Sequence, residues 1–202
     1  MPDASPNEDP RAIKGDLRLA AMARRDAIPA AERLQAAQRI AERGLPLDAG
    51  GRLGPGVTVS GYSPLKSEIS PLPLMRRCAD TGAALALPVV VGRSKPLIMR
   101  AWSFGAPLGS GVWGIREPTA DAAEVFPDIL LVPLLAFDRT GHRIGYGAGY
   151  YDMTIAALRT RKQVVAIGIA FAAQEITAVP ATPRDARLDL VLTERDVIDF
   201  RA

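Results

Sequence analysis

The residues best suited to chemistry are concentrated between positions 133 and 152, in the run PLLAFDRTGHRIGYGAGYYD. Glycines alternate at positions 145, 147 and 149, Arg143 precedes them, and Asp152 follows. Glycines let the backbone approach an anion closely, and N–H groups at a helix N-terminus bind phosphate oxygens. Arg143 supplies a planar donor for the same charge. Asp152 is the type of ligand that Mg²⁺ takes together with substrate phosphates. The segment therefore predicts a site for phosphate and Mg²⁺.

The position of this segment strengthens that prediction. Alternate glycines also occur in ordinary turns, so alone they are a weak sign of a binding loop. The segment is not a Walker A loop, because no Gly-Lys-Ser/Thr follows, and its spacing does not fit a Rossmann fingerprint. It does begin at the end of the predicted strand 129–133 and run into the start of a predicted helix at 150–159. In an open α/β sheet, ligands bind where a strand ends in this way.

Composition describes an ordinary soluble protein. Of the 202 residues, 48% are hydrophobic and 23% are charged, so one domain can bury a core without disulfides. Cys78 is the single cysteine, which excludes an intrachain disulfide and a Cys/His zinc site. The single histidine, His142, is interpreted as a loop residue, which argues against His-based catalysis.

Charge and hydropathy exclude two classes of partner. The net charge is +3, but basic residues are dispersed among acidic ones, so nucleic-acid binding is not expected. The first ten residues are polar and lack the pattern of a signal peptide. The apolar runs are too short to cross a bilayer, so no membrane partner is expected. These features indicate a cytoplasmic protein.

The pattern of elements predicts an α/β fold. Helices are expected at 10–28, 30–43, 70–82 and 150–159, and strands at 57–62, 84–91, 97–102, 129–133, 164–170 and 188–193. Residues 103–121 are rich in Gly and Pro and are expected to be irregular. Alternating strands and helices favour a single three-layer domain at 11–202, a mostly parallel sheet with helices on both faces. Strand 97–102 follows its predecessor directly and could be antiparallel, and residues 1–10 are expected to form a disordered tail.

Taken whole, the pattern AFDxxGxRxGxGxGYYD at 136–152 resembles the 5-formyltetrahydrofolate cyclo-ligase family. Four further elements resemble the same family in the same order: KGDLR at 14–18, YSPLKSEI at 62–69, WGIREP at 113–118 and RDARLD at 184–189. The chain departs from the family pattern at Ser63, Ala148, Met153 and Arg184. Ala148 replaces a common glycine, and a small residue there is acceptable if its φ is negative.

The resemblance implies specific roles. Catalysis is assigned to Arg143, Glu68 and Tyr151, and Mg²⁺ binding to Asp152 and Asp185. ATP, the co-substrate, is assigned to Lys14, Arg18, Arg143, Ile144, Gly145, Tyr146, Gly147, Ala148, Gly149, Tyr150 and Tyr151. The reduced folate is assigned to Ser63, Glu68, Trp113, Tyr150 and Tyr151. The implied reaction is the ATP-dependent cyclisation of 5-formyltetrahydrofolate to 5,10-methenyltetrahydrofolate by a ligase, and a monomer is favoured.

Each residue also has a simpler interpretation. Lys14 and Arg18 lie four apart and could form a solvated helix face. Glu68 could favour the following helix N-terminus, Trp113 could cover the core, and Asp185 could cap a turn. Three other functions stay open: a related ATP-dependent enzyme with another substrate, a sugar-phosphate isomerase or transferase, and a non-catalytic nucleotide- or folate-binding module.

Overall fold

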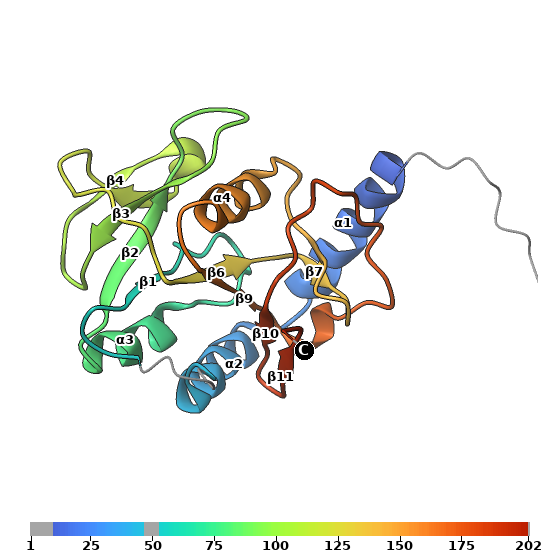
Figure 1. Ribbon diagram of the computed structural model, residues 1–202. Helices are drawn as coiled ribbons and strands as arrows, with labels where there is room; N and C mark the ends of the chain where they lie inside the picture. The colour runs from blue at the N-terminus through green and yellow to red at the C-terminus, as the bar shows by residue number, and fades with distance from the viewer. Residues whose placement is uncertain (1–9, 47–52, 202) are drawn as a thin grey trace, which may run out of the picture.

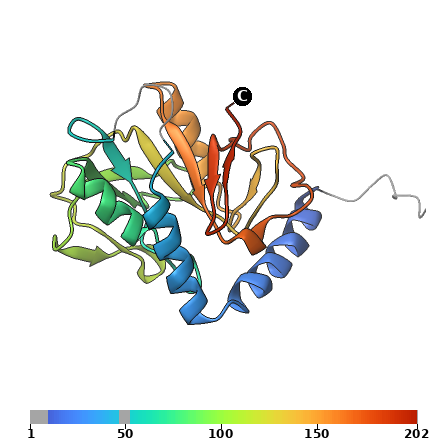
Figure 2. The ribbon, with the colours of Figure 1, turned by 90° about the horizontal axis from the view of Figure 1, so that it is seen from below.

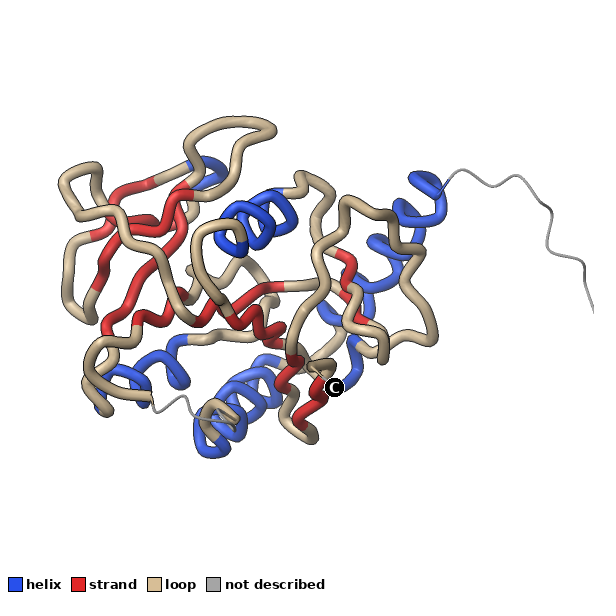
Figure 3. Tube along the Cα trace, viewed as in Figure 1, coloured by secondary structure: helices blue, strands red, loops and turns tan. Residues whose placement is uncertain are grey.

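The computed structural model describes residues 10–46 and 53–201, arranged around one seven-stranded sheet (Figures 1 and 3). In sheet order the strands are β11 (Val197–Asp199), β10 (Leu190–Leu192), β9 (Val165–Ile169), β6 (Ile129–Pro133), β1 (Thr58–Ser60), β2 (Ala84–Val89) and β3 (Ile98–Trp102). The five inner strands are parallel, and the edge strands β11 and β3 are antiparallel to their neighbours. This confirms the mostly parallel sheet and the antiparallel option for the 97–102 strand.

Helices cover both faces of the sheet, as predicted. Helices α2 (Ala30–Arg43) and α3 (Leu72–Asp80) pack with one buried cluster, and α4 (Tyr150–Arg159) packs with another on the opposite face. Helix α1 (Pro10–Asp26) packs against β8 (Arg143–Ile144) and the short helix η2 (Ala172–Gln174). Figure 2 shows α1 and α2 meeting at an angle. None of the helices within the described residues is long and apolar enough to cross a bilayer.

Strand β6 shows why the sequence folds into three layers. Ile129 and Leu131 belong to the cluster with α2 and α3, whereas Leu130 and Val132 belong to the cluster with α4. Successive side chains of a strand point to opposite faces, so a strand covered on both faces needs a continuous apolar run. Cys78 is fully buried in α3 and belongs to the core.

Several local predictions were right and others need correction. Helix α2 has the predicted bounds, with Gly44 at its C-cap, and α4 begins at Tyr150 as expected. Residues 103–121 are not irregular: β4 (Leu108–Ser110) and β5 (Arg116–Pro118) form a hairpin around the short helix η1 (Val112–Gly114). Strand β11 was also missed. Residues 1–9 of the predicted tail lie outside the described residues, and Pro10 already begins α1.

A second unpredicted hairpin lies inside the glycine-containing segment. Strands β7 (Ala136–Phe137) and β8 (Arg143–Ile144) pair antiparallel, with Ala136 opposite Ile144. Both strands are only two residues long, so they carry no alternation that a sequence pattern could reveal. The hairpin matters because it turns the chain back and places Arg143 beside α4.

Candidate active site

The main pocket lies where the strand order of the sheet reverses. From β1 the chain continues to β2 on one side, and it later returns to β6 on the other. Ligands of open α/β sheets bind outside the carboxyl ends of strands at such a switch point. Tyr62, which follows β1, and Pro133, which ends β6, both line the pocket. The location predicted for the glycine-containing segment is therefore confirmed.

The pocket has a volume of about 450 Å³, within the range of small-molecule sites. It brings together every residue that the sequence assigned to a site. These are Lys14, Arg18, Ser63, Glu68, Trp113, Arg143, Ile144, Gly145, Tyr146, Gly147, Ala148, Gly149, Tyr150, Tyr151, Asp152 and Asp185. His142 does not line the pocket, in agreement with its interpretation as a loop residue.

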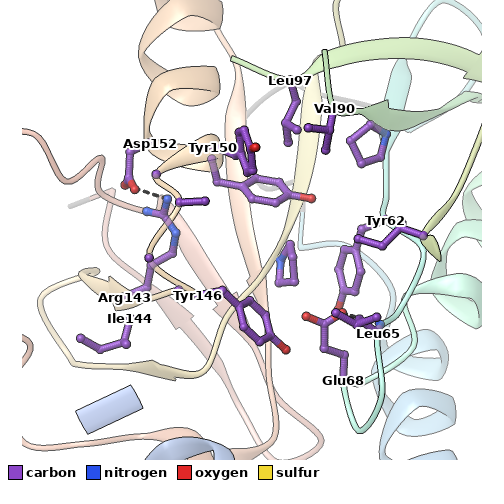
Figure 4. Close-up of a pocket in the computed structure, with 18 of the residues that line it drawn as sticks. Tyr62, Leu65, Glu68, Val90, Leu97, Arg143, Ile144, Tyr146, Tyr150 and Asp152 are labelled. Atoms are coloured by element: carbon purple, nitrogen blue, oxygen red, sulfur yellow. Dashed lines mark hydrogen bonds and ion pairs between the residues drawn. The ribbon is translucent and has the colours of Figure 1, made fainter. Parts of the chain in front are cut away.

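One side of the pocket is built around a buried arginine. Arg143 Nη2 donates to Asp152 Oδ1 at 2.8 Å, and Arg143 Nη1 donates to the carbonyl of Ala186 at 2.5 Å. The same Asp152 oxygen accepts the N–H of Ala186 at 3.0 Å. The first turn of α4, β8 and the segment around Ala186 are thus held together at this point. Figure 4 shows the Arg143–Asp152 pair.

Asp138 explains why the loop before Arg143 keeps its shape. Its side chain is only 3% exposed, and it accepts the N–H groups of Thr140, His142 and Val179 as well as the Thr140 hydroxyl. Burial raises the pKa of Asp138, but the hydrogen bonds from Thr140, Val179 and His142 outweigh it and hold the pKa below its usual value. Asp138 is therefore a structural residue of the motif.

We expect Asp138→Ala to lower the free energy of unfolding by about 1–3 kcal/mol, because three N–H groups, the buried one of Val179 among them, lose their acceptor. A folded-state pKa below the unfolded value means that Asp138 stabilises the protein above its unfolded pKa, and that this contribution is lost as pH falls through the folded pKa. Urea unfolding at pH 7 and near pH 3 measures both effects. A stability difference between wild type and variant that is as large near pH 3 as at pH 7 would contradict this role.

Lys14 and Arg18 do not form a solvated helix face. Lys14 Nζ lies 2.7 Å from Asp185 Oδ2, and Arg18 Nε donates to the carbonyl of Gly145 at 2.9 Å. Asp185 Oδ2 also accepts the N–H and hydroxyl of Thr182, so the interpretation of Asp185 as a turn cap is correct too. Burial raises the pKa of Asp185, but Lys14 and Thr182 outweigh it and lower the pKa.

The glycine loop, residues 144–149, bends tightly where it contacts Arg18. Gly147 has φ +98°, and a Cβ there would lie 3.3 Å from Arg18 Cζ. Gly149, with φ +70°, is the N-cap of α4. Ala148 is absent from the described residues with positive φ, which meets the condition set for an alanine at this position.

Gly147→Ala should weaken ATP binding about tenfold, because the strained φ and the contact with Arg18 together cost on the order of 1–3 kcal/mol. Calorimetry with a non-hydrolysable ATP analogue measures the change. Gly105→Ala is the matched control: Gly105 has φ +93° but lies outside the pocket, and nothing lies within 4 Å of its Cβ position. Equal affinities in both variants would argue against the loop as the nucleotide site.

The opposite side of the pocket carries a buried carboxylate. Glu68 Oε2 accepts the N–H of Leu65 at 2.7 Å, and Figure 4 shows Glu68 beside Tyr62, across the pocket from Arg143 and Asp152. Burial raises the pKa of Glu68, whereas the N–H of Leu65, the Tyr146 hydroxyl and Arg25 oppose the rise. Glu68 thus points into the pocket rather than toward the N-terminus of α3.

Three tyrosines, Tyr62, Tyr146 and Tyr151, line the same pocket as Arg143 and Glu68. Burial and Glu68 raise the pKa of Tyr146 to about 12, and they also raise the pKa values of Tyr62 and Tyr151. All three phenols are therefore protonated near neutral pH, and the Tyr62 hydroxyl already donates to the carbonyl of Ile69 at 2.7 Å.

Trp113 lies in η1 and not in an irregular loop. Its φ is +59°, its side chain is 66% exposed, and its ring centroid lies 6.3 Å from that of Tyr150. A large exposed aromatic ring at the rim of a pocket does not cover the core, so the simpler interpretation of Trp113 is wrong.

Asp152 and Asp185 fit a metal in their chemistry. Each uses one carboxylate oxygen for its bonds to the chain, Asp152 Oδ1 and Asp185 Oδ2. The other oxygen of each has no hydrogen bond within residues 10–46 and 53–201 and is left for a ligand. No group of three or more His, Cys, Asp or Glu side chains in this part of the chain could hold a metal alone. The pair fits Mg²⁺, which takes one or two carboxylates and completes its shell with phosphates and water.

Fold and pocket together define a three-layer α/β protein with a ligand site at its topological switch point. Residues 10–194 match the sequence model of the 5-formyltetrahydrofolate cyclo-ligase family. The chain is 33% identical over 197 residues to 5-formyltetrahydrofolate cyclo-ligase of Mycolicibacterium smegmatis, covering 93% of this chain and 97% of the relative. It is 30% identical over 148 residues to 5-formyltetrahydrofolate cyclo-ligase of Escherichia coli, covering 71% and 81%.

A solved structure agrees with these sequences. Aquifex aeolicus 5,10-methenyltetrahydrofolate synthetase has a TM-score of 0.76 and 27% identity, with 94% of both chains covered. The chain belongs to the 5-formyltetrahydrofolate cyclo-ligase family, which confirms the family and the enzyme class, a ligase, expected from its motifs.

Sequence reasoning missed part of the pocket wall. The additional lining residues are mostly apolar: Tyr62, Leu65, Pro88, Val90, Leu97, Ile115, Glu117 and Pro133. Tyr62, Leu65, Ile115 and Glu117 lie within or beside recognised motifs, so proximity in sequence could have identified them. Val90 and Leu97 flank the β2–β3 turn and resemble ordinary core residues, and no sequence signal distinguishes them.

Proposed function

We propose that the enzyme cyclises 5-formyltetrahydrofolate to 5,10-methenyltetrahydrofolate with conversion of ATP to ADP and phosphate. The observation that carries this proposal is the division of one pocket into two unlike sides. Arg143, the glycine loop and two carboxylates lie on one side, and a buried carboxylate with an apolar wall lies on the other. This arrangement suits a phosphoryl transfer from a triphosphate on one side to a ring system with a polar edge on the other.

ATP would bind on the Arg143 side. Lys14, Arg18 and Arg143 supply positive charge, and the loop amides of residues 144–149 supply further donors at the N-terminus of α4. Asp152 and Asp185 would hold Mg²⁺, which neutralises charge on the transferring phosphoryl group when bound. Arg143 is fixed by Asp152 and Ala186, so its donors are oriented before the substrate arrives.

The folate would bind on the Glu68 side. The pyrimidine ring of a reduced pterin presents neighbouring N–H donors, and a carboxylate accepts two such donors at once. Val90 and Leu97 provide apolar contact for the ring system, and Trp113 offers a flat surface at the rim. The Tyr151 hydroxyl, protonated at neutral pH, would donate to the formyl group or to a phosphate oxygen.

The chemistry needs positioning more than a protein nucleophile. An N-formyl group is a poor electrophile, because its oxygen would otherwise leave as hydroxide. Attack of the formyl oxygen on the γ-phosphorus forms a C–O–P bond and releases ADP. The neighbouring folate nitrogen then attacks the formyl carbon, loses its proton, and phosphate departs with the oxygen. The side chains hold the reactants in line and stabilise the developing charge. The cytoplasmic location and monomeric state expected from the sequence form part of this proposal.

The test is the release of ADP and phosphate on addition of 5-formyltetrahydrofolate to protein, ATP and Mg²⁺. The proposal requires one ADP for each folate consumed and little release without folate. If ATP is turned over only when a compound other than 5-formyltetrahydrofolate is present, the result would favour a related enzyme with another substrate. Turnover without ATP would favour an isomerase or transferase, and tight binding without turnover would favour a binding module.

A further inference from the structure

A buried arginine lies behind Glu68 and outside the lining of the pocket. Arg25, in α1, has a side chain that is 2% exposed, and its Nε donates to Ser67 Oγ at 3.0 Å. Its Nη1 lies 4.0 Å from Glu68 Oε1 and has no hydrogen-bond partner among the described residues. The guanidinium carbon is also 5.7 Å from the centre of the Tyr146 ring.

This placement is costly for a purely structural residue. A buried donor without an acceptor destabilises the folded state, and more so when the group is charged. Helix α1 would stay bonded to the 63–69 loop without the Arg25 guanidinium, because Ser67 also donates to Asp26 Oδ1 in the same helix. The open Nη1 faces the carboxylate of Glu68. Unsatisfied buried groups of this kind are often retained for function.

We propose that Arg25 is a positioning residue that holds the Glu68 carboxylate charged and in place, with Tyr146 beside it, for the incoming folate. This inference rests on the proposed function. Arg25 would act through Glu68 and not touch the reacting atoms itself.

The surroundings of Glu68 support this role. Groups from four elements face it: Arg25 on α1, Tyr62 after β1, Tyr146 on the glycine loop and Tyr151 on α4. The three phenols are neutral near pH 7, so among the described groups that influence Glu68, Arg25 supplies the positive charge. Burial acts in the opposite direction and raises the pKa of Glu68. Loss of Arg25 therefore leaves the carboxylate harder to ionise.

The experiment compares Arg25→Gln and Arg25→Lys with wild type and with Arg24→Gln, a control on the neighbouring exposed residue of the same helix. kcat and KM for 5-formyltetrahydrofolate are measured against pH at saturating ATP. In Arg25→Gln the acid limb of kcat/KM should move to higher pH by about one pH unit. In Arg25→Lys it should stay near the wild-type position, with KM raised several-fold because an ammonium lacks the planar fork. Binding of a non-hydrolysable ATP analogue should be unchanged in all variants.

A second readout does not depend on turnover. Carbon NMR titration of the Glu68 carboxyl, assigned with Glu68→Gln, should give a higher pKa in Arg25→Gln than in wild type. An unmoved acid limb and an unmoved Glu68 titration in Arg25→Gln would overturn the role of Arg25, even if wild type turns over. Should Arg25→Gln not fold, an acid limb that moves in Arg25→Lys, where the charge is kept, would overturn it as well. Absence of wild-type turnover with a shifted titration would instead count against the proposed function.

Discussion

Asp152→Ala is expected to lower kcat at least tenfold while the protein remains folded, because a metal clamp contributes several kcal/mol to phosphoryl transfer. Asp152 also fixes Arg143, so its loss frees the guanidinium to turn away from the phosphate. The measurement is kcat at increasing Mg²⁺, with thermal unfolding recorded in parallel. A rise in the Mg²⁺ concentration needed for half-maximal rate would separate loss of metal binding from loss of orientation.

The chain offers a closely matched control for this change. Asp189 forms an ion pair with Arg159 at 2.8 Å, its side chain is 26% exposed, and it lies outside the pocket. The Asp152–Arg143 pair has the same distance and the same aspartate exposure. Asp189→Ala should lose stability, because Asp189 also accepts the N–H of Ala166, but it should keep kcat within about twofold, because the residue lies outside the pocket. Full activity in Asp152→Ala would exclude it as a metal ligand.

Glu68→Gln is expected to lower kcat/KM for 5-formyltetrahydrofolate about 10- to 100-fold, because hydrogen bonds to a charged group contribute about 1.5–3 kcal/mol. Glutamine has the same size and keeps an oxygen for the Leu65 N–H, so the pocket retains its shape. The measurement is steady-state kinetics with folate varied at saturating ATP. Affinity for an ATP analogue should not change, because Glu68 lies across the pocket from Arg143.

The pH dependence of the same variant provides an independent check. Burial raises the pKa of Glu68, so the wild-type carboxylate is lost as pH falls through a value above that of an ordinary glutamate. Wild-type kcat/KM should therefore decline on the acid side, and this limb should be absent in Glu68→Gln. Persistence of the limb in the variant would assign it to another group and remove Glu68 from the folate site.

The long, strongly patterned elements could be predicted from sequence. Helix α2 and strand β6 were predicted with the bounds they have. A helical periodicity that ends at Gly44 fixes the end of α2, and an unbroken apolar run is typical of a buried strand such as β6. The β4–β5 hairpin and the β7–β8 hairpin were missed. Their strands are two or three residues long, and their pairing depends on contacts with distant parts of the chain.

For the site as well, some residues could be predicted from the sequence and others could not. Motif resemblance gathered residues as distant as Lys14 and Asp185, which the structure joins at 2.7 Å. It did not distinguish the structural role of Asp138 from the chemical residues beside it, because a buried acceptor and a ligand-facing carboxylate look alike in sequence. Arg25 was missed because it lies next to an exposed arginine on the same helix, and only packing shows which of the two is buried.

The most direct test of the proposed reaction is absorbance of the methenyl product, recorded with purified protein, 5-formyltetrahydrofolate and Mg²⁺, with and without ATP. An ATP-dependent rise in absorbance that requires the intact protein is the predicted result. No rise from folded protein that binds ATP would contradict cyclisation of this folate and would indicate a different substrate for the same pocket.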